Sequence, residues 1–167
     1  MGFVHTDIEE YISPAEMHYV TGTWADAAGQ VAGTIVKHKA AGAETGVVTI
    51  PIKMPQHASA LKGAMLNSIE IDYELLAAAA TSVTAVLNKV TRGADGAVAV
   101  VASVDITQDL AAAVAAATQD QHLLTVDVDT PAWADDGEYY LLQLSFVCGG
   151  VVTVDILGAV AKYTLRL

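Results

Sequence analysis

Five carboxylates that lie close together in the sequence are the residues best suited to metal chemistry. They are Asp127, Asp129, Asp135, Asp136 and Glu138. Calcium takes roughly six to eight oxygen ligands in proteins, so a group of this density could bind it. The spacing of an EF-hand is absent, however, and Asp and Gly are also ordinary residues of tight turns. Two interpretations therefore stay open here, a weak calcium site and a solvated turn.

Two tryptophans, Trp24 and Trp133, lie in or beside predicted loops, close to Asp and Gly residues. A loop tryptophan can stack on a sugar or anchor a protein interface, because its indole combines a large apolar face with a polar N–H group. The alternative is that each indole closes one end of the hydrophobic core.

Residues for other chemistry are few. The single cysteine, Cys148, excludes an intrachain disulfide, and its place before Gly149-Gly150 favours a small buried side chain. The five histidines show no pair at zinc-binding spacing. The sequence has no nucleophile elbow, phosphate-binding glycine loop or His-Glu-x-x-His motif. We therefore predict no catalytic residue, no cofactor and no enzymatic activity.

The charge of the chain restricts its partners. With 19 acidic and 8 basic residues among 167, the formal net charge is −11. A basic patch is missing, which disfavours nucleic acid and anionic membrane surfaces as partners. A protein, a cation or a neutral ligand such as a sugar remains. The apolar fraction of 53% suits a chain that buries surface against other subunits.

The elements that must position these residues are predicted to be strands. From Gln121 to Val147, apolar and polar residues alternate on both sides of a connection rich in Pro, Asp and Gly. The apolar members are Leu124, Val126, Val128, Tyr140, Leu142, Leu144 and Phe146. This pattern predicts two antiparallel strands paired with each other, with one buried face.

Further strands are predicted at 17–22, 31–38, 48–54, 68–75, 83–91, 97–104 and 151–167. Pro51 has no N–H group to donate to a ladder, so we expect it at an edge or facing outward. Asp95-Gly96 predicts a hairpin. The change of phase near Leu157-Gly158 predicts a β-bulge.

Two further segments have distinct expectations. In the strand at 68–75, Glu70, Asp72 and Glu74 share one face, and we expect them in solvent. The Ala-rich segment 107–120 is the one candidate helix, with Thr107 as its cap. A loop with a single helical turn is the alternative for that segment.

Many short strands with at most one helix predict an all-β fold, an antiparallel β-sandwich with a jelly roll as first choice. The predicted division is an N-terminal extended arm at 1–16 and a single β-sandwich domain at 17–167. The arm carries Phe3, Ile8, Tyr11 and Ile12. An arm with scattered large apolar residues either packs on its own domain or lies across a neighbouring subunit.

Several segments together resemble small β-sandwich proteins of tailed bacteriophage particles. They are Val48-Thr49-Ile50-Pro51-Ile52, Ser68-Ile69-Glu70-Ile71-Asp72-Tyr73, the strand at 80–87, and Thr130-Pro131-Ala132-Trp133 leading to 138–142. The resemblance covers roughly residues 46–167, ending in a Val/Tyr-rich segment at 160–167. It implies a capsid decoration (cement) protein, a homotrimer bound to the major capsid protein on the exterior of the virion.

The expected function is therefore that of a non-enzymatic virion structural protein, made in the host cytoplasm. Its expected interface residues are Phe3, Ile8, Tyr11, Ile12, Trp24 and Trp133. The alternative is a carbohydrate- or receptor-binding β-sandwich module of a phage fibre or tail, using Trp24 or Trp133 with or without calcium.

Overall fold

The computed structural model of the protein describes residues 5–29, 33–55, 63–93, 99–110, 121–135 and 137–166. Phe3, the Asp95-Gly96 pair, residues 111–120 and Asp136 lie outside these described residues. Among the residues that are described, no helix is long and apolar enough to span a bilayer.

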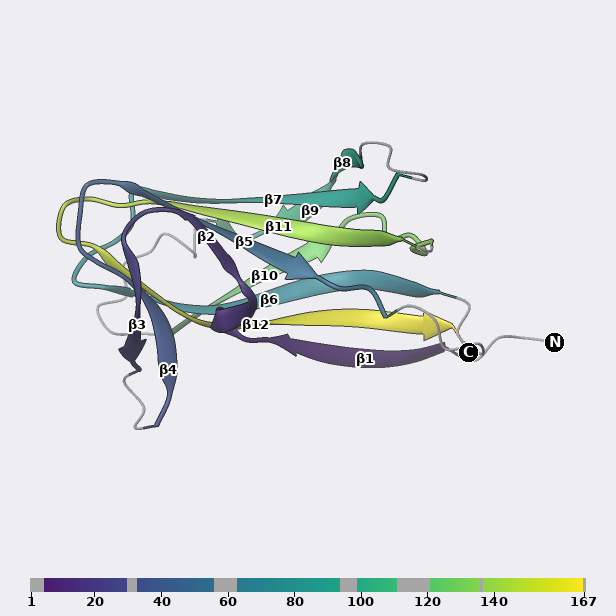
Figure 1. Cartoon of the computed structure of the whole chain (residues 1–167), viewed down its shortest axis with the longest axis horizontal. Coiled ribbons are helices and arrows are strands. Elements are labelled where there is room, and N and C mark those ends of the chain that lie inside the picture. The colour runs from purple at the N-terminus through teal and green to yellow at the C-terminus, as the bar shows by residue number, and fades with distance from the viewer. Residues whose placement is uncertain are drawn as a thin grey trace.

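Two antiparallel sheets pack face to face (Figure 1). We call the seven-stranded one sheet A; its order is β3 (Trp24–Ala28), β4 (Ile35–Lys39), β12 (Thr153–Arg166), β6 (Ala64–Leu76), β10 (Gln121–Val128) and β9 (Ile106–Gln108), with β1 (His5–Ile12) also paired to β12. The five-stranded one is sheet B; its order is β2 (His18–Thr21), β5 (Thr45–Ile52), β11 (Glu138–Val147), β7 (Ser82–Thr91) and β8 (Val100–Val104). A 3-10 turn, η1 (Pro14–Glu16), joins β1 to β2. The predicted all-β sandwich is confirmed.

The strand order is that of a jelly roll. The chain crosses between sheets at most of its connections, so that β4-β12-β6-β10 of sheet A face β5-β11-β7-β8 of sheet B. Each set interleaves early and late strands, which is the result of a long β-ribbon wound around itself. The two sheets are therefore held together by the chain path as well as by their shared core.

The core is built from the predicted alternation. Ile69, Ile71, Tyr73 and Leu75 of β6 are fully buried, and the inward residues of β10, β11 and β12 match the predicted sets. The bulge is also present, since the pairing of β12 with β6 slips between Ile156 and Gly158. Alternation identifies the buried face because side chains on a strand point to opposite sides in turn.

The predicted pairing of the two strands within 121–147 is wrong. β10 lies in sheet A beside β6 and β9, whereas β11 lies in sheet B between β5 and β7. The connection between them crosses from one sheet to the other instead of forming a hairpin. An alternating pattern shows which face is buried, but it carries no information about which strand lies alongside.

Three other expectations need correction. Thr107 lies within β9 and does not cap a helix. β6 begins at Ala64, four residues before the predicted strand. Its three outward carboxylates are only partly in solvent, and Glu74 is buried, because β10 and β12 flank this central strand.

The N-terminal segment is extended, as expected, and packs on its own domain. Residues 5–12 form β1, which pairs with 159–166 of β12 along its whole length (Figure 1). Ile12 is only 5% exposed and belongs to the core, with Ile8 packed against it. These residues are therefore part of sheet A and do not form a free arm.

Candidate functional site

The described members of the predicted calcium set do not form a metal site. Asp127 and Asp129 stand at the end of β10, and the Asp129 carboxylate accepts a hydrogen bond of 2.6 Å from the Thr107 hydroxyl. Glu138 begins β11 in the other sheet. Within the described part of the chain, no group of three His, Cys, Asp or Glu side chains could hold a metal ion.

Glu138 is instead the centre of an internal polar cluster. Its buried carboxylate accepts hydrogen bonds from the Asp135 N–H group (2.8 Å) and the Thr91 hydroxyl (3.2 Å), and it lies 2.9 Å from the Lys89 ammonium. Burial pushes the pKa of Glu138 up, but these donors outweigh it and leave the pKa below its usual value. These contacts indicate that the Glu138 carboxylate stabilises the fold.

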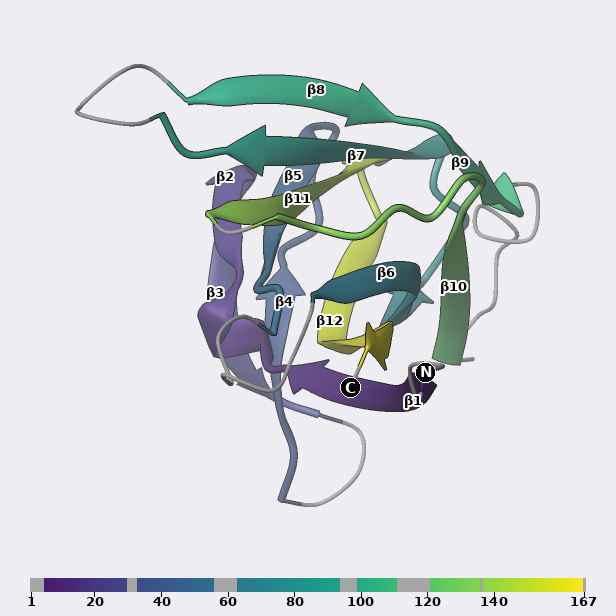
Figure 2. The same cartoon turned by 90° about the vertical axis from the view of Figure 1, so that its right-hand side faces the viewer.

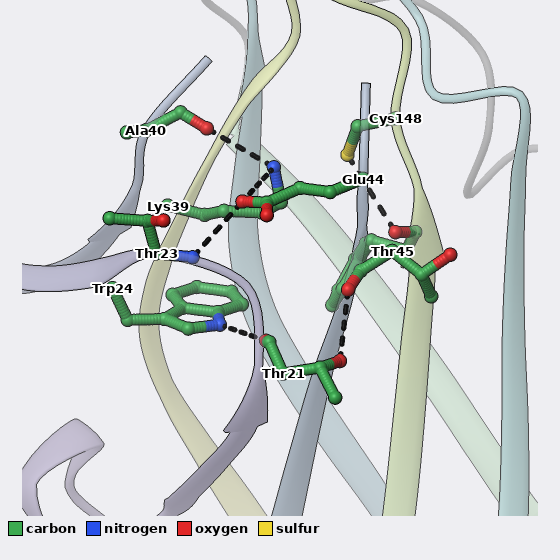
Figure 3. A network of polar contacts seen from close by, with 9 residues as sticks. Thr21, Thr23, Trp24, Lys39, Ala40, Glu44, Thr45 and Cys148 are labelled. Carbon is green, nitrogen blue, oxygen red and sulfur yellow. Dashed lines mark hydrogen bonds and ion pairs between the residues drawn. The ribbon is translucent and has the colours of Figure 1, made fainter. Parts of the chain in front are cut away.

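Trp24 closes one end of the sandwich, where the β2–β3 turn meets the β4–β5 and β11–β12 loops (Figure 3). Its indole N–H donates to the Thr21 carbonyl at 2.7 Å, and its ring lies against Tyr19 with centroids 4.8 Å apart. Gly46 leaves room for this arrangement, since a Cβ there would lie 3.0 Å from Cζ2 of the indole. The geometry is that of a core plug; an interface role for Trp24 stays a prediction.

Beside Trp24, Lys39 is completely buried. Its ammonium donates to the Ala40 carbonyl at 3.1 Å and lies 3.5 Å from Oε1 of Glu44, which also accepts the Thr23 N–H (Figure 3). Because the Glu44 side chain is 40% exposed, the ion pair reaches water at one end. The methylene stem of Lys39 therefore fills space in the core, while the Ala40 carbonyl and Glu44 compensate the charge of its ammonium.

We expect Lys39→Met to change the free energy of unfolding by less than about 1 kcal/mol, because an apolar side chain of similar length keeps the packing and Glu44 stays hydrated. Lys39→Ala should cost about 2 kcal/mol, because it leaves a cavity. Urea unfolding of both variants measures this. Equal losses in the two would show that the ammonium, and not the stem, stabilises this end.

Two more predicted residues are placed. Trp133 forms an isolated backbone β-bridge with Met65, and its ring is tilted against the His5 ring, with centroids 5.5 Å apart. It therefore lies near the first residues of β1 and β6, far along these strands from the bulge. Cys148 is buried, as predicted, and burial raises the pKa of its thiol. The neutral thiol is therefore favoured, which fits a structural residue.

The outer face of sheet A is rich in carboxylates. Lys162 of β12 lies 2.7 Å from Glu70 of β6 and 3.7 Å from Glu9 of β1. His38 is paired with Asp155 at 2.5 Å. Burial and the neighbouring Asp155 raise the pKa of Glu74. Few cations oppose these acids, so this face carries much of the negative charge of the chain.

A pocket of about 340 Å³ opens on the same face, between β1, the bulge of β12 and the start of β4. It is lined by Tyr11, Thr34, Ile35, Val36, Asp72 and Leu157. Burial, followed by the charge of Glu70, raises the pKa of Asp72. Tyr11 was expected at an interface, but the sequence did not connect it with Asp72, which is 61 positions away.

The outer face of sheet B has the opposite character. The outward residues of β5, β7 and β11 alternate with the core residues and include no Asp, Glu, Lys or Arg; they are Thr45, Val47, Thr49, Pro51, Ser82, Thr84, Val86, Asn88, Tyr139, Leu141, Gln143, Ser145 and Val147. Edge strand β8, at the rim of the sheet in Figure 2, is also uncharged and exposes Val100 and Val101. The sequence carries part of this signal, since the outward residues Leu141, Gln143 and Ser145 of one predicted strand are uncharged.

Comparisons with known proteins identify no family for this chain. No protein-family model matches the chain, and no curated protein matches it. Among solved structures, the chain is similar to the CBM22-1 xylan-binding domain of Xyn10C from Paenibacillus barcinonensis, with 13% identity and a TM-score of 0.45. The match covers 90% of this chain and 91% of that domain.

Proposed function

We propose that this chain is a non-enzymatic structural protein that assembles with further copies of itself through sheet B. The observation that carries the proposal is the uncharged outer face of that sheet in a chain with 27 charged residues. An exposed antiparallel sheet face normally carries polar and charged side chains. The centres of protein interfaces, in contrast, are depleted of charged residues.

The edge of sheet B supports the same assignment. Soluble proteins protect edge strands with lysine, proline or bulges, because an open ladder pairs readily with another chain. Residues 100–104 of β8 read Val-Val-Ala-Ser-Val, and the first four are exposed. Copies that each carry a net charge of −11 repel one another at the acidic face of sheet A, so self-association is most favourable at sheet B.

The specific form of the proposal is a capsid decoration protein of a tailed phage, a homotrimer bound to the major capsid protein on the outside of the virion. This form rests on the resemblance of residues 46–167 to phage particle proteins. Since β1 is part of sheet A, contact with the capsid would use exposed surface such as Tyr11 and not a released arm. Co-sedimentation with heads assembled from the major capsid protein tests it.

Light scattering of the purified protein across a range of concentrations tests self-association. We expect an oligomer that Val101→Lys weakens by about tenfold or more, because a lysine on the apolar edge must be desolvated at the interface. The matched control is Leu123→Lys on sheet A, since Leu123 is 59% exposed and Val101 is 60% exposed. A wild-type chain that stays monomeric, or equal effects of both variants, would overturn the proposal.

A further inference from the structure

The pocket on the outer face of sheet A has walls of two kinds. Ile35, Val36 and Leu157 supply apolar surface, and Ile35 is 72% exposed. Tyr11 and Asp72 supply an aromatic ring and a carboxylate. A small site that combines apolar walls with one charged group is selective for a ligand that has both an apolar stem and a charge of opposite sign.

The Tyr11 ring is held in a defined position. Its hydroxyl donates to the Leu157 carbonyl at 3.0 Å, which ties the end of the side chain to the bulge of β12. The ring lies directly over Gly158, where an added Cβ would be 2.6 Å from Cε2 of the tyrosine. The residue is nevertheless 60% exposed, so an aromatic face is presented without a large entropic cost of ordering it.

Among the described residues, Asp72 lacks a counter-charge. No hydrogen-bond donor or cation in that part of the chain is paired with its carboxylate, and Lys162 on the same face is engaged by Glu70 and Glu9. The register places Asp72 directly opposite Gly158, and therefore beside the Tyr11 ring. The raised pKa of Asp72 agrees with a carboxylate that is partly desolvated and lies next to a like charge.

We propose that this pocket binds the side chain of an arginine presented by another protein. A guanidinium can stack on the Tyr11 ring while its N–H groups donate to the Asp72 carboxylate, and its methylene stem packs on Ile35 and Leu157. The planar fork of arginine matches a carboxylate in two hydrogen bonds, which a lysine does not. Arginine is also enriched among the residues that dominate protein interfaces.

The site is on the opposite sheet from the self-association surface, so the inference does not depend on that proposal, and Val101→Lys should leave it intact. The probe is N-acetyl-arginine methylamide, titrated into the ¹⁵N-labelled protein and followed by NMR. Chemical-shift changes are expected to centre on Tyr11, Asp72 and Leu157. Binding of the probe is expected to weaken as the salt concentration increases. The citrulline analogue, which has nearly the same shape without the charge, is the matched ligand control.

Asp72→Asn should weaken binding of the arginine probe by about tenfold, because it removes the charge and half of the paired acceptors. Tyr11→Leu should weaken it several-fold while keeping an apolar side chain. Asp127→Asn should have no effect, because Asp127 is an exposed carboxylate of sheet A outside the pocket.

Three outcomes would overturn the proposal. They are equal binding of the citrulline analogue, an equal loss of binding in Asp127→Asn, and chemical-shift changes at these residues caused only by a neutral methyl glycoside. Asp72→Asn removes a like-charge repulsion, so it is expected to fold.

Discussion

Deletion of residues 1–12 should lower the free energy of unfolding by about 3 kcal/mol or more, a large part of the stability of a single domain. The reason is that β1 completes sheet A. Its eight residues pair with β12, Ile12 is buried in the core, and the Asp7 carboxylate accepts a 2.7 Å hydrogen bond from Thr164. Urea unfolding monitored by tryptophan fluorescence measures the loss.

Single substitutions separate the sources of this effect. Ile12→Ala should cost about 2–4 kcal/mol, because it leaves a cavity in the core. Glu9→Ala, on the exposed side of the same strand, should change stability by less than about 0.5 kcal/mol, because surface ion pairs contribute little. A truncated protein that unfolds at the same urea concentration as the full chain would mean that β1 is a dispensable arm after all.

Replacing Glu138 should also have a large effect, about 2–3 kcal/mol for Glu138→Gln at neutral pH. The carboxylate holds together the start of β11, the Asp135 turn and Lys89 of β7. The amide of glutamine has nearly the same shape, but it offers only one acceptor oxygen and no charge to Lys89 and the Asp135 N–H group. Hence the loss should arise from charge and acceptors, with little contribution from packing.

The effect should also depend on pH in a defined direction. Because the pKa of Glu138 is lowered by folding, its contribution is present above the unfolded-state pKa of about 4.3 and is lost as pH falls through the lower folded value. The difference between wild type and Glu138→Gln should therefore shrink below about pH 4. A difference that stays constant down to acidic pH would contradict this assignment.

Glu74 provides the opposite case and an internal control. Its pKa is raised by burial and by Asp155, so folding disfavours the ionised form, and this penalty disappears as pH falls through the raised value. Glu74→Gln should consequently be neutral or stabilising at pH 7. The same acid titration of the two glutamine variants thus distinguishes a carboxylate that stabilises the fold from one that does not.

The two sheets give the molecule two different surfaces. Sheet A displays carboxylates and a pocket with a fixed aromatic ring, whereas sheet B displays an uncharged face and an apolar edge. In a subunit of a larger assembly, these properties would place sheet B between copies and leave sheet A for partners and solvent. The two proposals can fail separately, because each is tested by variants on a different sheet.

Much of the local structure was determined by the sequence alone. The alternation at 68–75, 138–147 and 151–165 identified the buried residues, and the change of phase at Leu157-Gly158 identified the bulge. The burial of Cys148 was also predicted. These features are local consequences of the two-residue period of a strand, so a single stretch of sequence contains all the information needed.

Only the tertiary structure decided which strands are neighbours. β10 and β11 are consecutive and equally well patterned, yet they lie in different sheets, and β1 pairs with the last strand of the chain. Tyr11, Asp72 and Leu157 share a pocket only because β1 and β6 both lie against β12. Likewise, Glu138 is linked to Lys89 and not to Asp127. Pairing between distant strands depends on the packing of the whole sandwich, which no local pattern contains.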